Sequence, residues 1–258
     1  MEKNKKHSNQ WLKTIAFLVA IILVFPLWLK VGKDKVYEKD GICIYAGEDI
    51  NKADIAKVAD SALVLLKRHG IKTEGSTSII FYDSRKEFKW RNLFISSGAL
   101  AMNWWPFPYI TFAPVDLSKD RQFARKDILN ERPISSVIAH ELTHTYQAEQ
   151  LNIIRYKYQT IFHKWKTEGM AEVISESSSV PIEKGMELFL KNADKSEIAS
   201  LDIKGEYFYF KSHLKADYLL NFKKISLDDF WHNDYDESLL EEEIREAIQN
   251  GDYTPSWK

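Results

Sequence analysis

Two short motifs constrain this chain more than any other feature of its sequence. The first is HELTH over residues 140–144, and the second is EGMAE over residues 168–172. Residues four apart on a helix lie one turn above each other. His140 and His144 would therefore project from one face, at the separation that two ligands of a tetrahedral ion require. The first motif thus predicts a helix that carries two ligands of a zinc ion.

Two glutamates would complete such a site. Glu141 would lie beside the open position of the metal, where a carboxylate can take a proton from zinc-bound water with a pKa of about 7. Glu168 opens a second helical run, over residues 168–175, which can pack back against the first helix and deliver a third ligand. Four residues further on the same face, Glu172 is placed to accept the free ring N–H of a ligating histidine. We therefore predict a Zn²⁺ site with ligands His140, His144 and Glu168.

The plain alternative for the first motif is a polar helix face with two satisfied histidines. The flanking residues argue for the metal site, because they fit a helix. Pro133 suits a first helical position, and the apolar residues Ile134, Val137, Ile138 and Leu142 recur with a helical rather than a strand period.

The runs VIAHELTHTYQ and WKTEGMAEVIS resemble the gluzincin metallopeptidases, and within them the bacterial peptidases of the MA-like type. The match extends from Ile134 to about Ser178 and covers the rest of the chain in outline. The resemblance implies an α+β zincin fold with two lobes, a small mixed or antiparallel sheet with an antiparallel edge strand above the active-site helix, and a helical C-terminal lobe. It implies the same site roles: His140, His144 and Glu168 as ligands, Glu141 as base and Glu172 as the outer partner.

Tyr209 and His213 are candidates for a further catalytic role. In gluzincins a Tyr or His of the C-terminal lobe reaches the oxyanion of the tetrahedral intermediate, and these two residues lie four apart, on one helix face. The stretch over residues 209–211 is similar to the YxK stretch of gluzincin aminopeptidases, which favours Tyr209. Aromatic core packing is the alternative for either residue. Residues 98–103 lack the acid of the GAMEN exopeptidase motif, so the resemblance favours an endopeptidase over an aminopeptidase.

Composition fits one catalytic domain, expected over residues 40–258. A chain of 258 residues that is 45% hydrophobic can bury one core. A formal net charge of −1 gives no electrostatic reason to expect a nucleic-acid partner. The single cysteine, Cys43, excludes an internal disulfide and is expected to be a buried thiol.

The N-terminus predicts a transmembrane helix over residues 14–31. Its apolar core follows a short basic tail, residues 1–13, and lies between Trp11 and Trp28, which a helix would separate by about 26 Å. A cleaved signal peptide is the alternative, but no small-x-small site follows. We therefore expect a single-pass protein of the cell membrane, in contact with the lipid bilayer. A linker over residues 32–39 would lead to a catalytic domain outside the cytoplasm.

Other elements follow from hydrophobic period and turn residues. Helices are expected over residues 51–69, 182–192, 206–221 and 237–249, and strands over residues 77–82 and 109–113. The strand over 109–113 is where a sheet edge that pairs with an extended peptide would lie. The aromatic loop over residues 103–108 is interpreted as packed on the core, with an apolar lip of a substrate cleft or a patch that touches the bilayer as alternatives.

Three classes of function remain. The favoured one is a membrane-anchored zinc metallopeptidase that hydrolyses peptide or protein substrates with Glu141 as general base. The second is a catalytically silent gluzincin-like domain that serves as a membrane-tethered binding module, and the third is an anchored scaffold in which HELTH is accidental. Glu141 argues against the second class, because a retired site has no need of its base.

Overall fold

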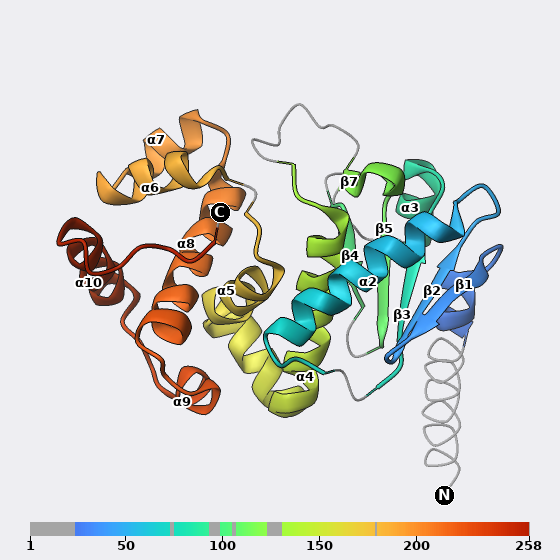
Figure 1. Ribbon diagram of the computed structural model, residues 1–258, viewed down its shortest axis with the longest axis horizontal. Helices are drawn as coiled ribbons and strands as arrows, with labels where there is room; N and C mark the ends of the chain where they lie inside the picture. Colours follow the sequence, from blue (N-terminus) through green and yellow to red (C-terminus); the bar gives the residue numbers. More distant parts are fainter. Residues whose placement is uncertain are drawn as a thin grey trace, which may run out of the picture. The chain divides into compact units, whose positions relative to one another are not determined.

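The computed structural model divides the chain into two compact units. The described residues are 24–72, 75–92, 99–104, 107–122, 131–178 and 180–257. The first unit comprises Met1–Ile50 and Thr77–Pro114, and the second comprises Asn51–Ser76 and Val115–Lys258. The elements are those of an α+β protein that is mostly helical, with a small mixed sheet (Figure 1). The expected domain over residues 40–258 therefore covers parts of both units.

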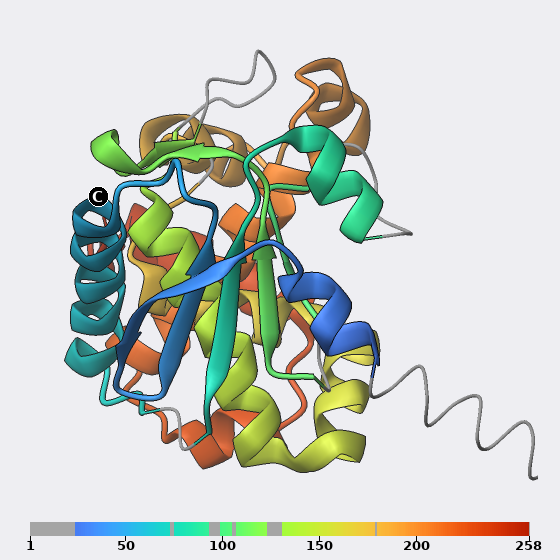
Figure 2. The ribbon, with the colours of Figure 1, turned by 90° about the vertical axis from the view of Figure 1, so that its right-hand side faces the viewer.

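The first unit is built on a five-stranded sheet with the strand order β1-β2-β3-β5-β4. β2, β3 and β5 are parallel, whereas β1 and β4 run antiparallel to their neighbours (Figure 2). The elements of this unit are β1 (Asp34–Lys39), β2 (Ile42–Ala46), β3 (Thr77–Phe81), α3 (Arg85–Arg91), β4 (Ala101–Asn103) and β5 (Tyr109–Phe112). Both strands expected from the sequence, β3 and β5, are present.

The central strand β3, with the sequence TSIIF, is rich in the β-branched and aromatic residues that favour strands. All five of its residues are buried, as is typical of a parallel strand that is covered on both faces. β5 pairs with β3 on one side and with β4 on the other. The expectation of a sheet edge over residues 109–113 is therefore wrong, since β4 takes that position in the described sheet.

Trp104 explains how the end of β4 is held. Its indole Nε1 donates to Asn92 Oδ1 over 2.8 Å, and the hydroxyl of Thr111 on β5 donates to the same oxygen over 2.8 Å. The ring of Trp104 also packs against the core of the first unit. The interpretation of the aromatic loop as core packing holds for this residue, while Trp105 and Pro106 lie outside the described residues.

The range expected as a polar linker, residues 32–39, contains strand β1. Asp40 and Gly41 join β1 to β2, and both have positive φ, 46° and 77°. A two-residue Asp-Gly turn of this kind matches the twist of paired antiparallel strands. The hairpin turn, rather than the polar composition of β1, decides the structure of this segment.

The transmembrane helix expected over residues 14–31 is also corrected. Within the described part of the chain, no helix combines the length and the apolar character needed to cross a bilayer. Residues 14–23 lie outside the described residues. Residues 24–30 are helical, and there Leu29 is fully buried in the core of the first unit, with its carbonyl accepting a hydrogen bond from the Tyr82 hydroxyl. The membrane localisation expected on the basis of this helix is accordingly not supported.

The second unit is largely helical. Its elements are α2 (Lys52–Arg68), β6 (Val115–Asp116), the 3-10 helix η1 (Leu117–Lys119), β7 (Arg121–Gln122), α4 (Ile134–Phe162), α5 (Lys164–Ser175), α6 (Ile182–Leu190), α7 (Lys195–Ser200), α8 (Lys204–Asp217), the π-helix η2 (Tyr218–Phe222), α9 (Leu227–His232) and α10 (Glu237–Gln249). The helices that the sequence predicts in this unit are present, as α2, α4, α5, α6, α8 and α10. α2 begins as predicted, because the Asn51 side chain accepts from the Ala53 N–H over 2.9 Å.

Three helices position the motif residues. α5 packs against both α4 and α8, and the small Gly169 allows the close approach of α8. A Cβ at this position would lie 2.3 Å from the Ser212 carbonyl oxygen and 2.9 Å from the Ala216 Cβ. Glycine inside a helix is locally unfavourable, so its place in EGMAE is explained by packing rather than by helix propensity.

Candidate metal centre

The three residues predicted as ligands lie together in the second unit. His140 and His144 are one turn apart on α4, and Glu168 comes from α5. The two histidine Nε2 atoms are 3.2 Å apart, and Glu168 Oε2 lies 3.4 Å from the Nε2 of His140 and 3.3 Å from that of His144. These side chains form a group that could hold a metal ion.

The size of this triangle fits one ion. Ligand atoms at 2.0–2.1 Å from a tetrahedral ion lie about 3.3–3.4 Å from each other. The three separations, 3.2, 3.3 and 3.4 Å, are close to this edge length. The three atoms could therefore hold a single ion between them.

His140 is held from behind by a charged pair. Its Nδ1 lies 3.0 Å from Glu172 Oε1, and the same oxygen accepts a 2.8 Å hydrogen bond from Arg132 Nη1. The carboxylate of Glu172 is completely buried. This contact directs the other ring nitrogen, Nε2, toward Glu168, as expected for a metal-ligating histidine. Glu172 thus lies next to the His140 ring, and its role as the partner of a metal ligand stays a prediction.

Arg132 was not identified from the sequence. It precedes α4, and its guanidinium also donates to the hydroxyls of Ser175, over 2.9 Å, and Ser177, over 3.1 Å. It therefore joins the start of α4 to the end of α5 around the Glu172 carboxylate. No local pattern marks this arginine, because its partners lie on another helix.

His144 is held by a neutral group instead. Its Nδ1 is 3.1 Å from Gln147 Oε1, and the amide nitrogen of Gln147 donates to the Thr167 carbonyl over 2.9 Å. Gln147 thereby orients the second histidine and ties it to the residue before Glu168. This role was missed, although the spacing of three residues on a helix was a usable signal.

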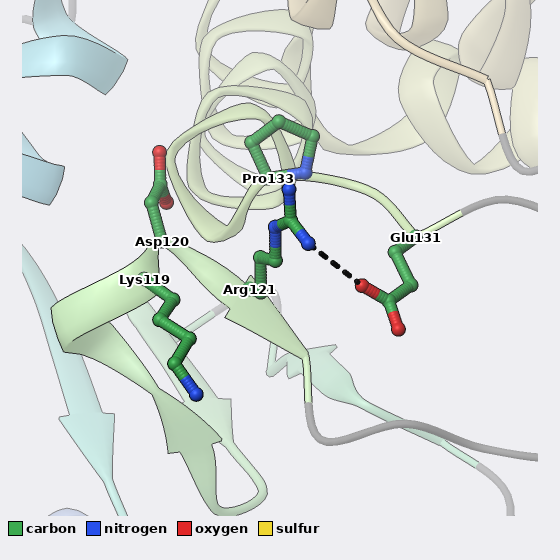
Figure 3. Close-up of a pocket in the computed structure, with 5 residues that line it drawn as sticks. All are labelled: Lys119, Asp120, Arg121, Glu131 and Pro133. Atoms are coloured by element: carbon green, nitrogen blue, oxygen red, sulfur yellow. Dashed lines mark ion pairs between the residues drawn. The ribbon is translucent and has the colours of Figure 1, made fainter.

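The start of α4 is anchored separately from the ligands. Asp120 accepts from the Ser135 N–H over 2.8 Å and from its hydroxyl over 2.5 Å. Figure 3 shows a pocket at this place, lined by Lys119, Asp120, Arg121, Glu131 and Pro133. In it Arg121 and Glu131 form an ion pair of 3.7 Å. The contacts of Asp120 with Ser135 fix the start of α4, where Pro133 immediately precedes the first helical residue.

The group of His140, His144 and Glu168 attracts positive charge. Burial by itself lowers the pKa of His140, but the neighbouring carboxylates of Glu168 and Glu172 raise it to about 9. Burial raises the pKa of Glu168, but the two histidines hold it well below its usual range. Carboxylates that stay ionised against these rings are suited to a divalent cation, which would meet the same demand.

Glu141 lies half-buried on α4, between the two histidines in sequence. Its negative charge acts on His144 and on Tyr209, and in each case helps to raise the pKa of that group. A general base must lie close to the group from which it takes a proton, and Glu141 is close enough to His144 to act on its charge. Its assignment as base stays a prediction.

The two candidates for the oxyanion donor differ in their surroundings. The ring centroid of Tyr209 is 6.3 Å from that of His140, and burial together with Glu168 and Glu141 raises the pKa of its hydroxyl. His213 is buried, and its ring is stacked on Trp257 with centroids 3.6 Å apart. Tyr209 thus lies beside a ligand and keeps its proton, as a donor must, whereas His213 is packed against the C-terminal segment.

Tyr156 is a second tyrosine near the group and was missed. It is buried, and after burial itself the largest causes that raise its pKa are Glu168 and Glu141. A break in α4 at Asn152, with φ 56° and ψ 166°, precedes it and turns the helix face. No period counted from HELTH could therefore have placed Tyr156 at the site.

No protein-family model and no curated protein matches this chain in sequence. The resemblance to the gluzincin peptidases therefore rests on the residues of the two sequence motifs alone.

Proposed function

We propose that this chain is a zinc-dependent metallopeptidase that cleaves internal bonds of polypeptides. The observation that supports this most is the triangle of His140 Nε2, His144 Nε2 and Glu168 Oε2, with sides of 3.2–3.4 Å. Two imidazoles and one carboxylate that leave a fourth position open are the ligand set of a catalytic rather than a structural zinc site.

The donor set favours zinc over other common ions. Ca²⁺ and Mg²⁺ prefer six or more oxygen ligands, and here two of the three donor atoms are imidazole nitrogens. A structural zinc site would be closed by four protein ligands, but within the described residues the group has three. The outer contacts from Glu172 and Gln147 match the pattern that fixes histidine ligands in metal sites.

The chemistry follows from the side chains around this group. Zinc, when bound, polarises a carbonyl group and lowers the pKa of a coordinated water to about 7. Glu141 takes a proton from the attacking water and later delivers it to the leaving amine. Tyr209, whose raised pKa keeps it protonated, donates a hydrogen bond to the oxygen that becomes negative as the carbonyl is attacked.

The test combines metal analysis with proteolysis of the full chain. The parent should hold about one zinc and cleave a denatured protein substrate such as casein. Glu168→Ala should lose the metal and the activity, while Glu141→Gln should keep the metal and lose turnover. Glu149→Gln makes the same change at an exposed position of α4 and should alter neither.

Two results would contradict the proposal. Zinc binding by Glu168→Ala that is as tight as in the parent would remove the ligand assignment. A zinc-loaded parent without hydrolysis of any peptide would leave a metal-binding module in place of an enzyme.

A further inference from the structure

The second half of α4 carries an exposed apolar surface. Ile154 is 80% exposed and Phe162 is 66% exposed. We call the exposed set the apolar stripe; it consists of Ile153, Ile154, Tyr158, Ile161 and Phe162. Four of the five residues follow the spacing of one helix face, a face that is normally polar on a surface helix. Contiguous exposed apolar side chains of this kind mark binding surfaces.

The direction of the stripe is fixed by the structure of α4. At the break, the Asn152 side chain accepts from the N–H groups of Ile154 and Arg155, each over 3.2 Å, and so starts a new helical segment. On the opposite face of that segment, Tyr156 and Gln159 are buried, and Gln159 donates to the Trp231 carbonyl over 3.0 Å. Because one face is held inside, the stripe faces outward.

The charged side chains on the helical segment that carries the stripe are all of one sign. Between Asn152 and Lys164 the sequence contains Arg155 and Lys157 but no aspartate or glutamate. Arg155 lines a hollow together with Asn152, Ile154 and Tyr158. An apolar hollow with a cation at its side fits a segment in which apolar side chains neighbour acidic ones.

A series of side-chain neighbours leads from the stripe to the candidate metal centre. Tyr158 lies 5.0 Å from Phe162 and 5.4 Å from His163, measured between ring centroids. The next residue, Lys164, has its Nζ 5.8 Å from the Tyr209 ring, which neighbours His140. A polypeptide that contacts the stripe could therefore continue to the candidate metal centre.

We propose that the apolar stripe binds the polypeptide substrate outside the cleaved bond, and selects segments in which apolar residues alternate with acidic ones. This inference rests on the proposed peptidase function and names the substrate class of the same site. Each large apolar side chain that is covered on binding should contribute about a tenfold gain in affinity.

The direct test is binding of labelled peptides to the zinc-loaded Glu141→Gln chain, followed by fluorescence anisotropy. A peptide in which leucine and aspartate alternate (the leucine-aspartate peptide) should bind more tightly than peptides of equal length in which leucine alternates with lysine or serine alternates with aspartate. The double variant Ile154→Ser, Phe162→Ser should weaken binding by about a hundredfold. Leu239→Ser, which removes an exposed apolar side chain from α10, should leave the affinity unchanged.

A charge reversal gives a readout that misfolding cannot imitate. Arg155→Glu should weaken binding of the leucine-aspartate peptide and strengthen binding of the leucine-lysine peptide. When the stripe substitutions are made in the chain that retains Glu141, they should raise KM for the leucine-aspartate peptide and leave kcat unchanged. KM for a peptide too short to reach the stripe should stay the same.

The outcomes separate this inference from the proposed function. Stripe-dependent binding without any cleavage by the parent would support the surface and overturn the peptidase. Cleavage with the same KM in all stripe variants would overturn the surface. So would stripe-dependent binding of anionic phospholipid vesicles without peptide binding, or self-association that the double variant abolishes.

Discussion

His140 and His213 are both buried histidines of the second unit, yet their surroundings act on them in opposite directions. The pKa of His140 is raised to about 9, and that of His213 is lowered to about 4. Burial disfavours the charged ring in both cases. The difference is that His140 is within reach of Glu168 at 3.4 Å and Glu172 at 3.0 Å, whereas His213 is stacked on Trp257.

Contact with carboxylates, rather than burial, thus decides which histidine belongs to a site for cations. The region around His140 is a network in which each polar atom orients the next, from Arg132 through Glu172 to the ring. The region around His213 is aromatic packing, held by the C-terminal segment. Tyr253 belongs to the same C-terminal segment as Trp257, and its hydroxyl donates to the Asp217 carboxylate over 2.6 Å.

The largest expected difference between the two regions is catalytic. Tyr209→Phe, beside His140, removes only a hydroxyl and should lower kcat by about 10² or more with little change in KM. His213→Phe keeps a ring on Trp257 and should leave kcat near the parent value. Steady-state kinetics on one peptide substrate compare both variants. The opposite result, with loss only in the His213 variant, would move the donor role to the histidine.

Acid stability should depend on His213. Because its pKa is about 4 in the folded chain and about 6.5 in an unfolded one, the unfolded chain binds the extra proton between these values. Stability is therefore fully present above pH 6.5 and is lost as the pH falls toward 4, by roughly 3 kcal/mol from this residue. His213→Phe should show a flatter decline over that range in urea unfolding experiments. Parallel curves for the two proteins would mean that the ring is not held neutral.

Glu172→Gln should weaken the His140 side of the centre. The neutral amide keeps the shape of the carboxylate but removes the charge that raises ligand basicity, so metal affinity should fall by about 10 to 100-fold. Competition with a chromophoric zinc chelator measures this. Glu176→Gln is the matched control, since that carboxylate is one turn further on and pairs with Arg68 and His69. An equal loss in both variants would show a general electrostatic effect.

The helices that carry the candidate ligands could be predicted because each depends on a local pattern. His140 and His144 are fixed by the period of one helix, and the helix of Glu168 follows from its own short motif. Arg132 and Tyr156 could not be predicted in this way. The arginine meets Glu172 only after α5 has packed against α4, and the break at Asn152 changes the face on which Tyr156 lies.

The linker and the transmembrane helix were predicted wrongly because other features of the sequence received more weight than they should have. The Asp-Gly pair at residues 40–41 is a strong hairpin signal, yet the polar segment before it was interpreted as a linker. The apolar N-terminal stretch was judged by its hydropathy, its basic flank and its two tryptophans. Its residue Leu29 in fact packs with Tyr82 and Phe88 in the first unit, a contact that hydropathy cannot reveal.

The smallest expected effect concerns the neutral side of the centre, behind His144. Gln147→Leu keeps the bulk of the side chain but removes the acceptor for His144 Nδ1 and the donor to the Thr167 carbonyl. Zinc affinity should fall about tenfold, at the lower end for such partners, because the lost hydrogen bond is uncharged. Gln150→Leu makes the same change at an exposed position of α4 and should bind zinc as the parent does. A loss in Gln147→Leu as large as in Glu172→Gln would show that orientation of the ring, and not the charge behind it, limits metal binding.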